Sequence, residues 1–103
     1  MSQNPIYTFA KWQIKEGRLP AVLKVLTEVA KQTKLEKGNL FYKIHQSNSD
    51  ANTLILFEGY ANEAAVEEHR GAAYFQNLVI GQIIPDLENR EVILASQLDI
   101  DEN

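Results

Sequence analysis

The stretch Thr53 to Tyr60, TLILFEGY, decides the fold of this chain. It is almost wholly apolar, so both faces of an extended strand would carry apolar side chains, which is typical of a strand covered on both sides. A polar turn at residues 47–52 precedes it, and residues 39–47 before that turn alternate between two faces. The two runs therefore predict a β-hairpin inside a larger sheet.

Outward from the hairpin, the chain divides into strands and amphipathic helices. Pro20 fits the first turn of a helix, and Asn62 is a predicted N-cap. Gly38 and Pro85 are typical stop signals. The predicted elements are a strand at residues 6–15, a helix at 19–36, strands at 39–47 and 53–60, helical pieces at 63–70 and 72–84 with a bend at Gly71, and a strand at 90–98. This β-α-β-β-α-β order predicts an α+β fold of the ferredoxin-like kind with an antiparallel sheet and a second helix broken in two.

Length, charge and composition narrow the class of protein. The 103 residues predict a single domain, with an ordered core at residues 5–98 and an acidic tail at 99–103. A net charge of −4 offers no electrostatic footprint for nucleic acid, and no apolar run is long enough to span a membrane. The chain has no cysteine, which excludes disulfides and thiolate chemistry and suits a cytoplasmic protein. Its first residues lack the basic and apolar regions of a signal peptide, so we expect none.

Whichever face of the sheet the helices cover, the other face stays apolar. That uncovered face carries either Phe9, Phe41, Ile55, Phe57 and Ile93, or Trp12, Leu40, Leu54, Leu56 and Leu94. Such a face is typical of an interaction surface, and covering each side chain contributes roughly 1.5–3 kcal/mol. We therefore expect a homodimer that pairs through the sheet, because most soluble oligomers are twofold homodimers. The alternative is a tight hairpin with a few tolerated apolar side chains on its surface.

Three segments together resemble the antibiotic biosynthesis monooxygenase domain family: EKGNLFYKIHQ at residues 36–46, LFEGY at 56–60 and EHRGAAYF at 68–75. The resemblance implies a dimeric α+β barrel in which each subunit holds a cavity between its sheet and its helices. Some members of this family oxygenate polycyclic phenols or quinols with O₂ and use no metal or flavin cofactor. Others isomerise a small phosphorylated signalling sugar, degrade haem, or have no known activity. Two positions depart from the family pattern, since Asn39 replaces a Cys and Tyr74 replaces a second His.

Oxygenation of this kind needs an apolar pocket, a base for the substrate hydroxyl and a group that steadies the anion. His69 is the candidate base, because it shares a helix face with Ala65 and Val66 and a neutral imidazole accepts a proton near neutral pH. The alternative is that His69 braces the bend at Gly71 through the backbone. Tyr74 is a candidate donor to a substrate oxygen, or else a core aromatic residue with its hydroxyl near the surface.

Six further residues are candidates for binding a small aromatic substrate. Glu58 and Tyr60 share a strand face, and Glu58 is either a pocket carboxylate or, as we favour, the salt-bridge partner of a cation such as Arg70 or Arg90. Aromatic side chains could wall the pocket or simply fill the core. They are Trp12, Phe41, Tyr42 and Phe75. With two histidines far apart and no clustered carboxylates, we expect no metal site and no cofactor.

Three functions compete for this pattern. The first is a homodimeric, cofactor-independent monooxygenase that oxidises a small quinol-like or polyphenolic aromatic with O₂. The second is an isomerase of a small phosphorylated sugar, which ranks lower because the sequence shows no evident inward lysine or arginine to hold a phosphate. The third is a non-catalytic, ligand-binding or stress-related dimer, which a cavity filled by its own side chains would favour.

Overall fold

The computed structural model describes residues 4–100. The elements are β1 (Ile6–Ile14), α1 (Leu19–Lys34), β2 (Asn39–Gln46), β3 (Thr53–Tyr60), α2 (Glu63–Gly71), the π-helix η1 (Phe75–Ile83), the short 3₁₀ helix η2 (Ile84–Asp86) and β4 (Leu87–Ala95). The predicted β-α-β-β-α-β order and the ferredoxin-like α+β fold are confirmed. The end of the predicted acidic tail, residues 101–103, lies outside the described residues.

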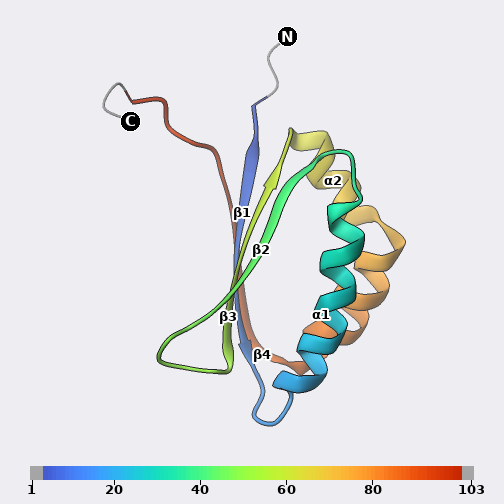
Figure 1. The fold of residues 1–103 in the computed structure, drawn as a ribbon, viewed down its shortest axis with the longest axis vertical. Coiled ribbons are helices and arrows are strands. Elements are labelled where there is room, and N and C mark those ends of the chain that lie inside the picture. The colour runs from blue at the N-terminus through green and yellow to red at the C-terminus, as the bar shows by residue number, and fades with distance from the viewer. Residues whose placement is uncertain (1–3, 101–103) are drawn as a thin grey trace.

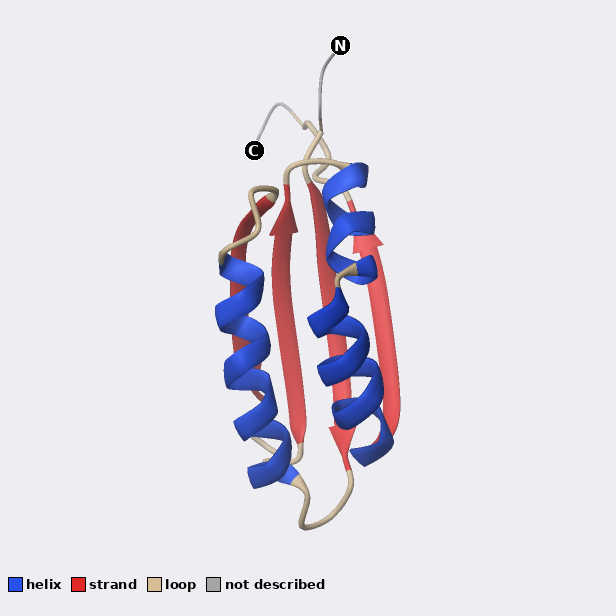
Figure 2. Cartoon of the chain, turned by 90° about the vertical axis from the view of Figure 1, so that its right-hand side faces the viewer, coloured by secondary structure: helices blue, strands red, loops and turns tan. Residues whose placement is uncertain are grey.

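The four strands form one antiparallel sheet in the order β2-β3-β1-β4. Figure 1 shows the sheet edge-on with the helices on one side only, and Figure 2 shows the helices lying across that face. The last strand begins at Leu87, earlier than the predicted residue 90, because β1 continues to Ile14 and pairs there with Leu87 after a register shift. None of the described helices is long and apolar enough to cross a membrane.

The core lies between the helices and the face of the sheet that carries Trp12. Along β1 the side chains of Ala10, Trp12 and Ile14 are buried, whereas those of Phe9 and Lys11, which point to the other face, are exposed. The register pairs Ala10 with Leu56 and Trp12 with Leu54, so neighbouring strands bury the same face. The helices cover this face with apolar side chains, namely Val22, Leu26, Val29, Val66, Val79 and Ile83.

Gly38 has a different role from the predicted one. The helix α1 ends at Lys34 and is followed by Leu35 in right-handed helical geometry, so its end does not depend on a glycine. A Cβ atom added to Gly38 would lie 2.4 Å from Cβ of Ala65 in α2. Gly38 is therefore required for the close approach of the segment after α1 to α2, which brings Glu36 near that helix.

The second helical region breaks at Ala72, whose extended backbone (ψ 143°) separates α2 from the next helix. Residues 75–83 then form a π-helix, and the backbone N–H of Ile84 bonds to the carbonyl of Val79, five residues back. The sequence predicts an ordinary helix over 72–84, so the wider coil is a departure from that prediction. A π-helical segment is rare and is frequently found at functional sites.

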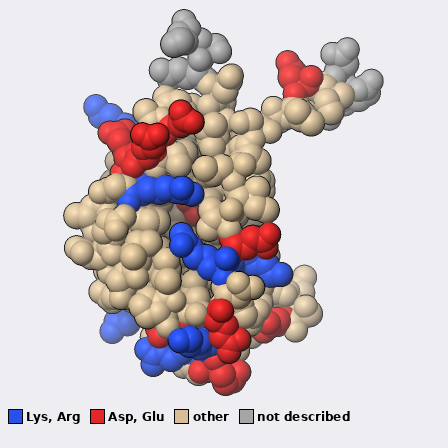
Figure 3. Space-filling view, turned by 180° about the vertical axis from the view of Figure 1, so that it is seen from behind, with Lys and Arg blue, Asp and Glu red and all other residues tan. Residues whose placement is uncertain are grey.

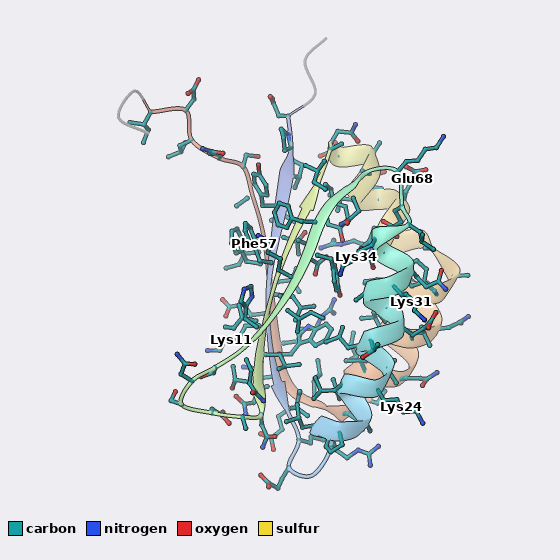
Figure 4. All side chains as sticks on the ribbon, in the orientation of Figure 1. Lys11, Lys24, Lys31, Lys34, Phe57 and Glu68 are labelled. Atoms are coloured by element: carbon teal, nitrogen blue, oxygen red, sulfur yellow. The ribbon has the colours of Figure 1, made fainter. Side chains whose placement is uncertain are left out.

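The opposite face of the sheet is covered by no described helix. It carries an aromatic cluster in which Phe57 lies 4.8 Å from Phe9 and 4.7 Å from Phe41 between ring centroids. Phe57 and Lys11 point away from the helices in Figure 4. We call this surface the outer face, and the face that packs against the helices the inner face.

Candidate functional site

A small pocket lies between the inner face of the sheet and the helices α2 and η1. Its volume is about 30 Å³, enough for one or two water molecules. Its wall contains Thr8, Ala10, Trp12, Tyr42, Glu58, Val66, His69, Arg70, Phe75, Val79, Arg90 and Val92. Apolar side chains and a few polar groups thus meet in one concave place, as in small-molecule sites.

His69 is buried in this wall between two carboxyl groups. The α2 helix places it on the same face as Ala65 and Val66, four and three positions earlier, so it points toward the sheet. Its Nδ1 lies 3.0 Å from Oε2 of Glu36, and its Nε2 lies 3.8 Å from Oε1 of Glu58. Glu36, which follows α1, was not among the site residues that the sequence predicts.

The contacts of His69 determine which ring nitrogen carries the proton. Burial lowers the pKa of His69 below 6.5, and the hydrogen bond to Glu36 opposes that shift only in part, so the ring is neutral near pH 7. A neutral imidazole has one N–H, and a carboxylate can only accept a hydrogen bond. The N–H is therefore on Nδ1, toward Glu36, and the lone pair is on Nε2, on the side of Glu58.

Tyr74 lies behind His69 and outside the pocket wall. Its hydroxyl donates a short hydrogen bond to Glu36 and lies 3.2 Å from Nδ1 of His69 and 3.0 Å from Oγ1 of Thr33. Burial and the hydrogen bond to Glu36 raise the pKa of Tyr74, so it stays protonated. Tyr74 and Glu36 thus position the imidazole from behind.

Glu58 contributes a buried carboxyl group to the pocket wall. Burial raises its pKa to about 7, although the hydroxyl of Tyr60, which donates to Oε1 at 2.6 Å, opposes this shift. The favoured salt bridge of Glu58 to Arg70 or Arg90 is not formed. Within residues 4–100 the close polar partners of its carboxyl are Tyr60 and His69, and the two arginines lower its pKa only from a distance.

The two arginines themselves line the pocket, and neither forms an ion pair with a carboxylate of residues 4–100. Arg70 comes from α2 directly after His69, and Arg90 comes from β4 opposite Trp12. Both are exposed. The expectation that no lysine or arginine reaches the pocket is wrong, because both arginines line it. Arg90 and Val92 lie two residues apart, so they share one face of their strand. Only the register with β1 shows that this is the face that carries Trp12.

Trp12 brings a donor without a partner to the pocket. Its side chain is 3% exposed, and its Nε1 is the one buried side-chain nitrogen or oxygen of residues 4–100 that lacks a hydrogen bond. Buried donors of this kind are rare, because losing water without a new partner costs roughly 1–3 kcal/mol. An oxygen atom in the pocket could accept this hydrogen bond.

Seven of the eight predicted site residues lie in the pocket wall or directly behind it. Trp12, Tyr42, Glu58, His69 and Phe75 meet in the pocket wall, and the ring of Phe75 stands edge-on to His69 at 5.0 Å. Tyr60 and Tyr74 lie behind the wall, where the hydroxyl of Tyr60 bonds to Glu58 and that of Tyr74 lies 3.2 Å from Nδ1 of His69.

Phe41 does not join this pocket, contrary to the prediction that it walls it. It lies on the outer face, because β2 alternates and its neighbour Tyr42 is the residue that pairs with Glu58 on the inner face. In the part of the chain that is described, no group of three or more His, Cys, Asp or Glu side chains could hold a metal ion.

The fold and the pocket define a class: a small ferredoxin-like α+β protein with a buried, carboxylate-held histidine between sheet and helices. Residues 5–79 match the family described as antibiotic biosynthesis monooxygenase. The chain belongs to this family, as the resemblance implied.

Individual relatives agree with this assignment. The chain is 28% identical over 74 residues to "Putative monooxygenase Rv0793" of Mycobacterium tuberculosis, covering 72% of each chain. It is 25% identical over 67 residues to "Putative monooxygenase YcnE" of Bacillus subtilis, covering 65% of this chain and 70% of that protein. The solved structure of Rv0793 superposes with a TM-score of 0.85 at 26% identity, over 94% of this chain and 98% of that chain. PA3566 from Pseudomonas aeruginosa, at 21% identity, shares the fold with a TM-score of 0.87, over 96% of this chain and 99% of that chain.

Proposed function

We propose that this protein is a monooxygenase that oxidises a small quinol-like or polyphenolic aromatic with O₂ and without a metal or organic cofactor. The observation that carries the proposal is the orientation of His69. Glu36 binds its Nδ1 at 3.0 Å, which leaves Nε2 of a neutral imidazole as a base inside the pocket. A carboxylate that fixes a histidine tautomer in this way is a common arrangement for general-base catalysis.

The reaction begins when Nε2 of His69 takes the proton of a ring hydroxyl. The resulting phenolate gives one electron to O₂, and the two radicals combine to form a bond between a ring carbon and oxygen. The protonated His69 returns its proton to the peroxide anion, and the resulting hydroperoxide loses water: its O–O bond and the C–H bond at the same carbon break, and a carbonyl forms. One quinol and one O₂ thus become one hydroxyquinone and one water.

Two further groups assist in this proposal. The N–H of Trp12 donates to the oxygen on which negative charge develops, which a preorganised donor in a dry site does with little reorganisation. Tyr74 is a positioning residue, because it contacts Glu36 and His69 and lies outside the pocket wall.

The size of the pocket requires a movement before an aromatic ring can enter. A volume of about 30 Å³ is too small for a ring. Phe75 and Val79 of η1 form part of the wall, and the break at Ala72 separates η1 from α2. We propose that η1 shifts to admit the ring. The same small volume is the observation that favours the non-catalytic alternative.

Oxygen uptake with a reduced naphthoquinone as substrate tests the proposal. The His69→Gln variant should lose at least about a hundredfold in rate, the lower range of general-base contributions. His45→Gln is the matched control, because His45 is exposed on β2 on the other face of the sheet. No uptake by the parent would overturn the monooxygenase proposal and favour the ligand-binding alternative. Equal uptake by parent and His69→Gln would remove His69 as the base.

An isomerase of a phosphorylated sugar is the second candidate, and one observation now favours it. Arg70 and Arg90 line the pocket, so the cations that a phosphate needs are present. Incubation with a phosphorylated pentulose, followed by NMR of the sugar carbons, tests it. Conversion that is lost in Arg90→Gln would support the isomerase, and an unchanged sugar would count against it.

We also propose that the outer face pairs with the same face of a second copy. Phe9 (41% exposed), Ile55 (36%) and Ile93 (52%) lie on this face around the aromatic cluster, and no described helix covers it. Light scattering after size exclusion should give twice the chain mass. Phe9→Lys should shift the protein to monomer, and Leu23→Lys, which changes an equally exposed residue (40%) on α1, should not. A parent monomer at micromolar concentration would refute the pairing.

The proposed location is the cytoplasm. A chain without cysteine neither needs nor uses an oxidising compartment. Cell fractionation with an antibody to the native protein tests this location, and recovery in a membrane or exported fraction would contradict it.

A further inference from the structure

We propose that the ligand of this pocket carries an anionic group, which Arg70 and Arg90 hold at the mouth of the pocket. The inference rests on the proposed function for the aromatic end of the ligand, but it concerns the opposite end of the molecule. It identifies the substrate class as a quinol with an acidic substituent, or, for the isomerase alternative, a phosphorylated compound.

The two arginines bring positive charge to the pocket that no ion pair within residues 4–100 balances. They come from different elements, α2 and β4, and the fold directs both to one pocket. Their mutual repulsion adds to burial in lowering the pKa of Arg90. Within residues 4–100 neither has an ion-pair partner, whereas Arg18, the third arginine of the chain, binds Asp86 at 3.1 Å. Two guanidinium groups that face one cavity and form no ion pair there are a fitting site for the carboxylate or phosphate of a ligand.

The arginines also differ from the other polar residues of the pocket wall in how exposed they are. Arg70 and Arg90 are exposed, whereas Trp12 and His69 are 3% and 4% exposed. A ligand that places its hydroxyl groups against the buried pair therefore has its other end at the arginines. In Figure 3, basic side chains lie across the middle of the molecule's back face, with acidic side chains beside them. The unpartnered N–H of Trp12 independently points to a ligand oxygen at the inner end.

The carboxyl group of Glu58 faces the same pocket and acts against an anion when it is ionised. Burial raises its pKa to about 7, so it is largely neutral below this pH. His69 is neutral above its lowered pKa and adds no charge there. A ligand with a carboxylate should consequently bind most tightly at slightly acidic pH, where the arginines are the charged groups of the pocket.

Anaerobic calorimetry with 2,5-dihydroxybenzoate and its uncharged amide tests the inference without any turnover. The parent should bind the acid about tenfold to a hundredfold more tightly than the amide, the range expected for hydrogen bonds to charged groups. Arg70→Gln and Arg90→Gln should each lose most of this preference and leave amide binding unchanged. Arg18→Gln is the matched control, since it removes a guanidinium that already has a partner outside the pocket wall.

The NMR signal of the single indole N–H reports the inner end of the ligand, because the chain has one tryptophan. This signal should shift downfield when 2,5-dihydroxybenzoate binds to the parent. It should shift in the same way in Arg90→Gln at a saturating concentration of the acid, because this variant lowers only the affinity. Equal affinities for acid and amide, or an acid affinity that both arginine variants retain, would overturn the inference.

The binding and oxygen-uptake experiments together show which of the two proposals fails. Arginine-dependent binding of the acid without oxygen uptake supports the anion site and refutes the monooxygenase. Oxygen uptake that shows no preference for acidic quinols supports the monooxygenase and refutes the anion site. Arginine-dependent binding of inorganic phosphate, with no binding of the dihydroxybenzoate, supports the anion site and assigns it to a phosphorylated ligand.

Discussion

Replacing Glu58 by glutamine should change how the stability of this protein depends on pH. Burial raises the pKa of Glu58 from 4.5 to about 7 in the folded state. Between these two values the folded state keeps a proton that the unfolded state has lost, so the free energy of unfolding falls as the pH rises through this window. At about 1.36 kcal/mol for each pH unit, the difference from 4.5 to about 7 amounts to about 3 kcal/mol. Glu58 is 6% exposed, so solvent screens little of this cost.

The glutamine side chain of the Glu58→Gln variant cannot ionise, and its amide oxygen can still accept the hydrogen bond from Tyr60. Urea unfolding of this variant and the parent, at one protein concentration, should be compared near pH 4 and again well above pH 7. From the acidic to the alkaline condition, the variant should gain about 3 kcal/mol relative to the parent. Glu68→Gln, on the exposed side of α2, controls for the chemical change itself. A stability difference that stays constant across the pH range would refute the burial argument.

Three further predictions follow from single contacts. Gly38→Ala should destabilise the protein by roughly 1–3 kcal/mol in urea unfolding, because the new Cβ would lie 2.4 Å from that of Ala65; a neutral effect would show that α2 can move away freely. Glu36→Gln should lower the pKa of His69 further in an NMR titration, because the charge and hydrogen bond of Glu36 raise it; an unchanged or higher value would contradict the contact. Phe75→Ala should lower the free energy of unfolding by less than the roughly 3–5 kcal/mol of a fully buried phenylalanine, since Phe75 is half-buried. Because Phe75 forms part of the pocket wall, the same variant should lower KM for a naphthalene-sized quinol. A raised KM would contradict the proposed opening at η1.

Local pattern was enough to predict part of the pocket wall, including His69 and Trp12. His69 follows Ala65 and Val66 at helical spacing, and Trp12 follows Ala10 two positions later along β1. Each therefore shares a face with buried neighbours. Which residues share a face of a helix or strand depends only on their spacing in the sequence, and the structure places these residues as the spacing predicts. Phe41 shows the limit of the same reasoning, because alternation gives two faces without saying which one the helices cover.

Contacts between distant parts of the chain were not predictable in this way. Glu36 reaches His69 across 33 positions in sequence, because Gly38 lets its segment approach α2. Arg90 stands beside Trp12 only because β4 pairs with β1 in one particular register. The expected salt bridge of Glu58 failed for the same reason, since it assumed a distance between elements that only packing sets.

The sequence by itself determined the order of the elements, the amphipathic helices and the two apolar faces of the sheet, because these follow from periods of two and 3.6 residues along the chain. Only the tertiary structure decided which face the helices cover and where the outer aromatic cluster lies. It also decided that His69 lies between two carboxyl groups and that two arginines share the mouth of its pocket. These features depend on strand register and on the distances between packed elements, which no local pattern records.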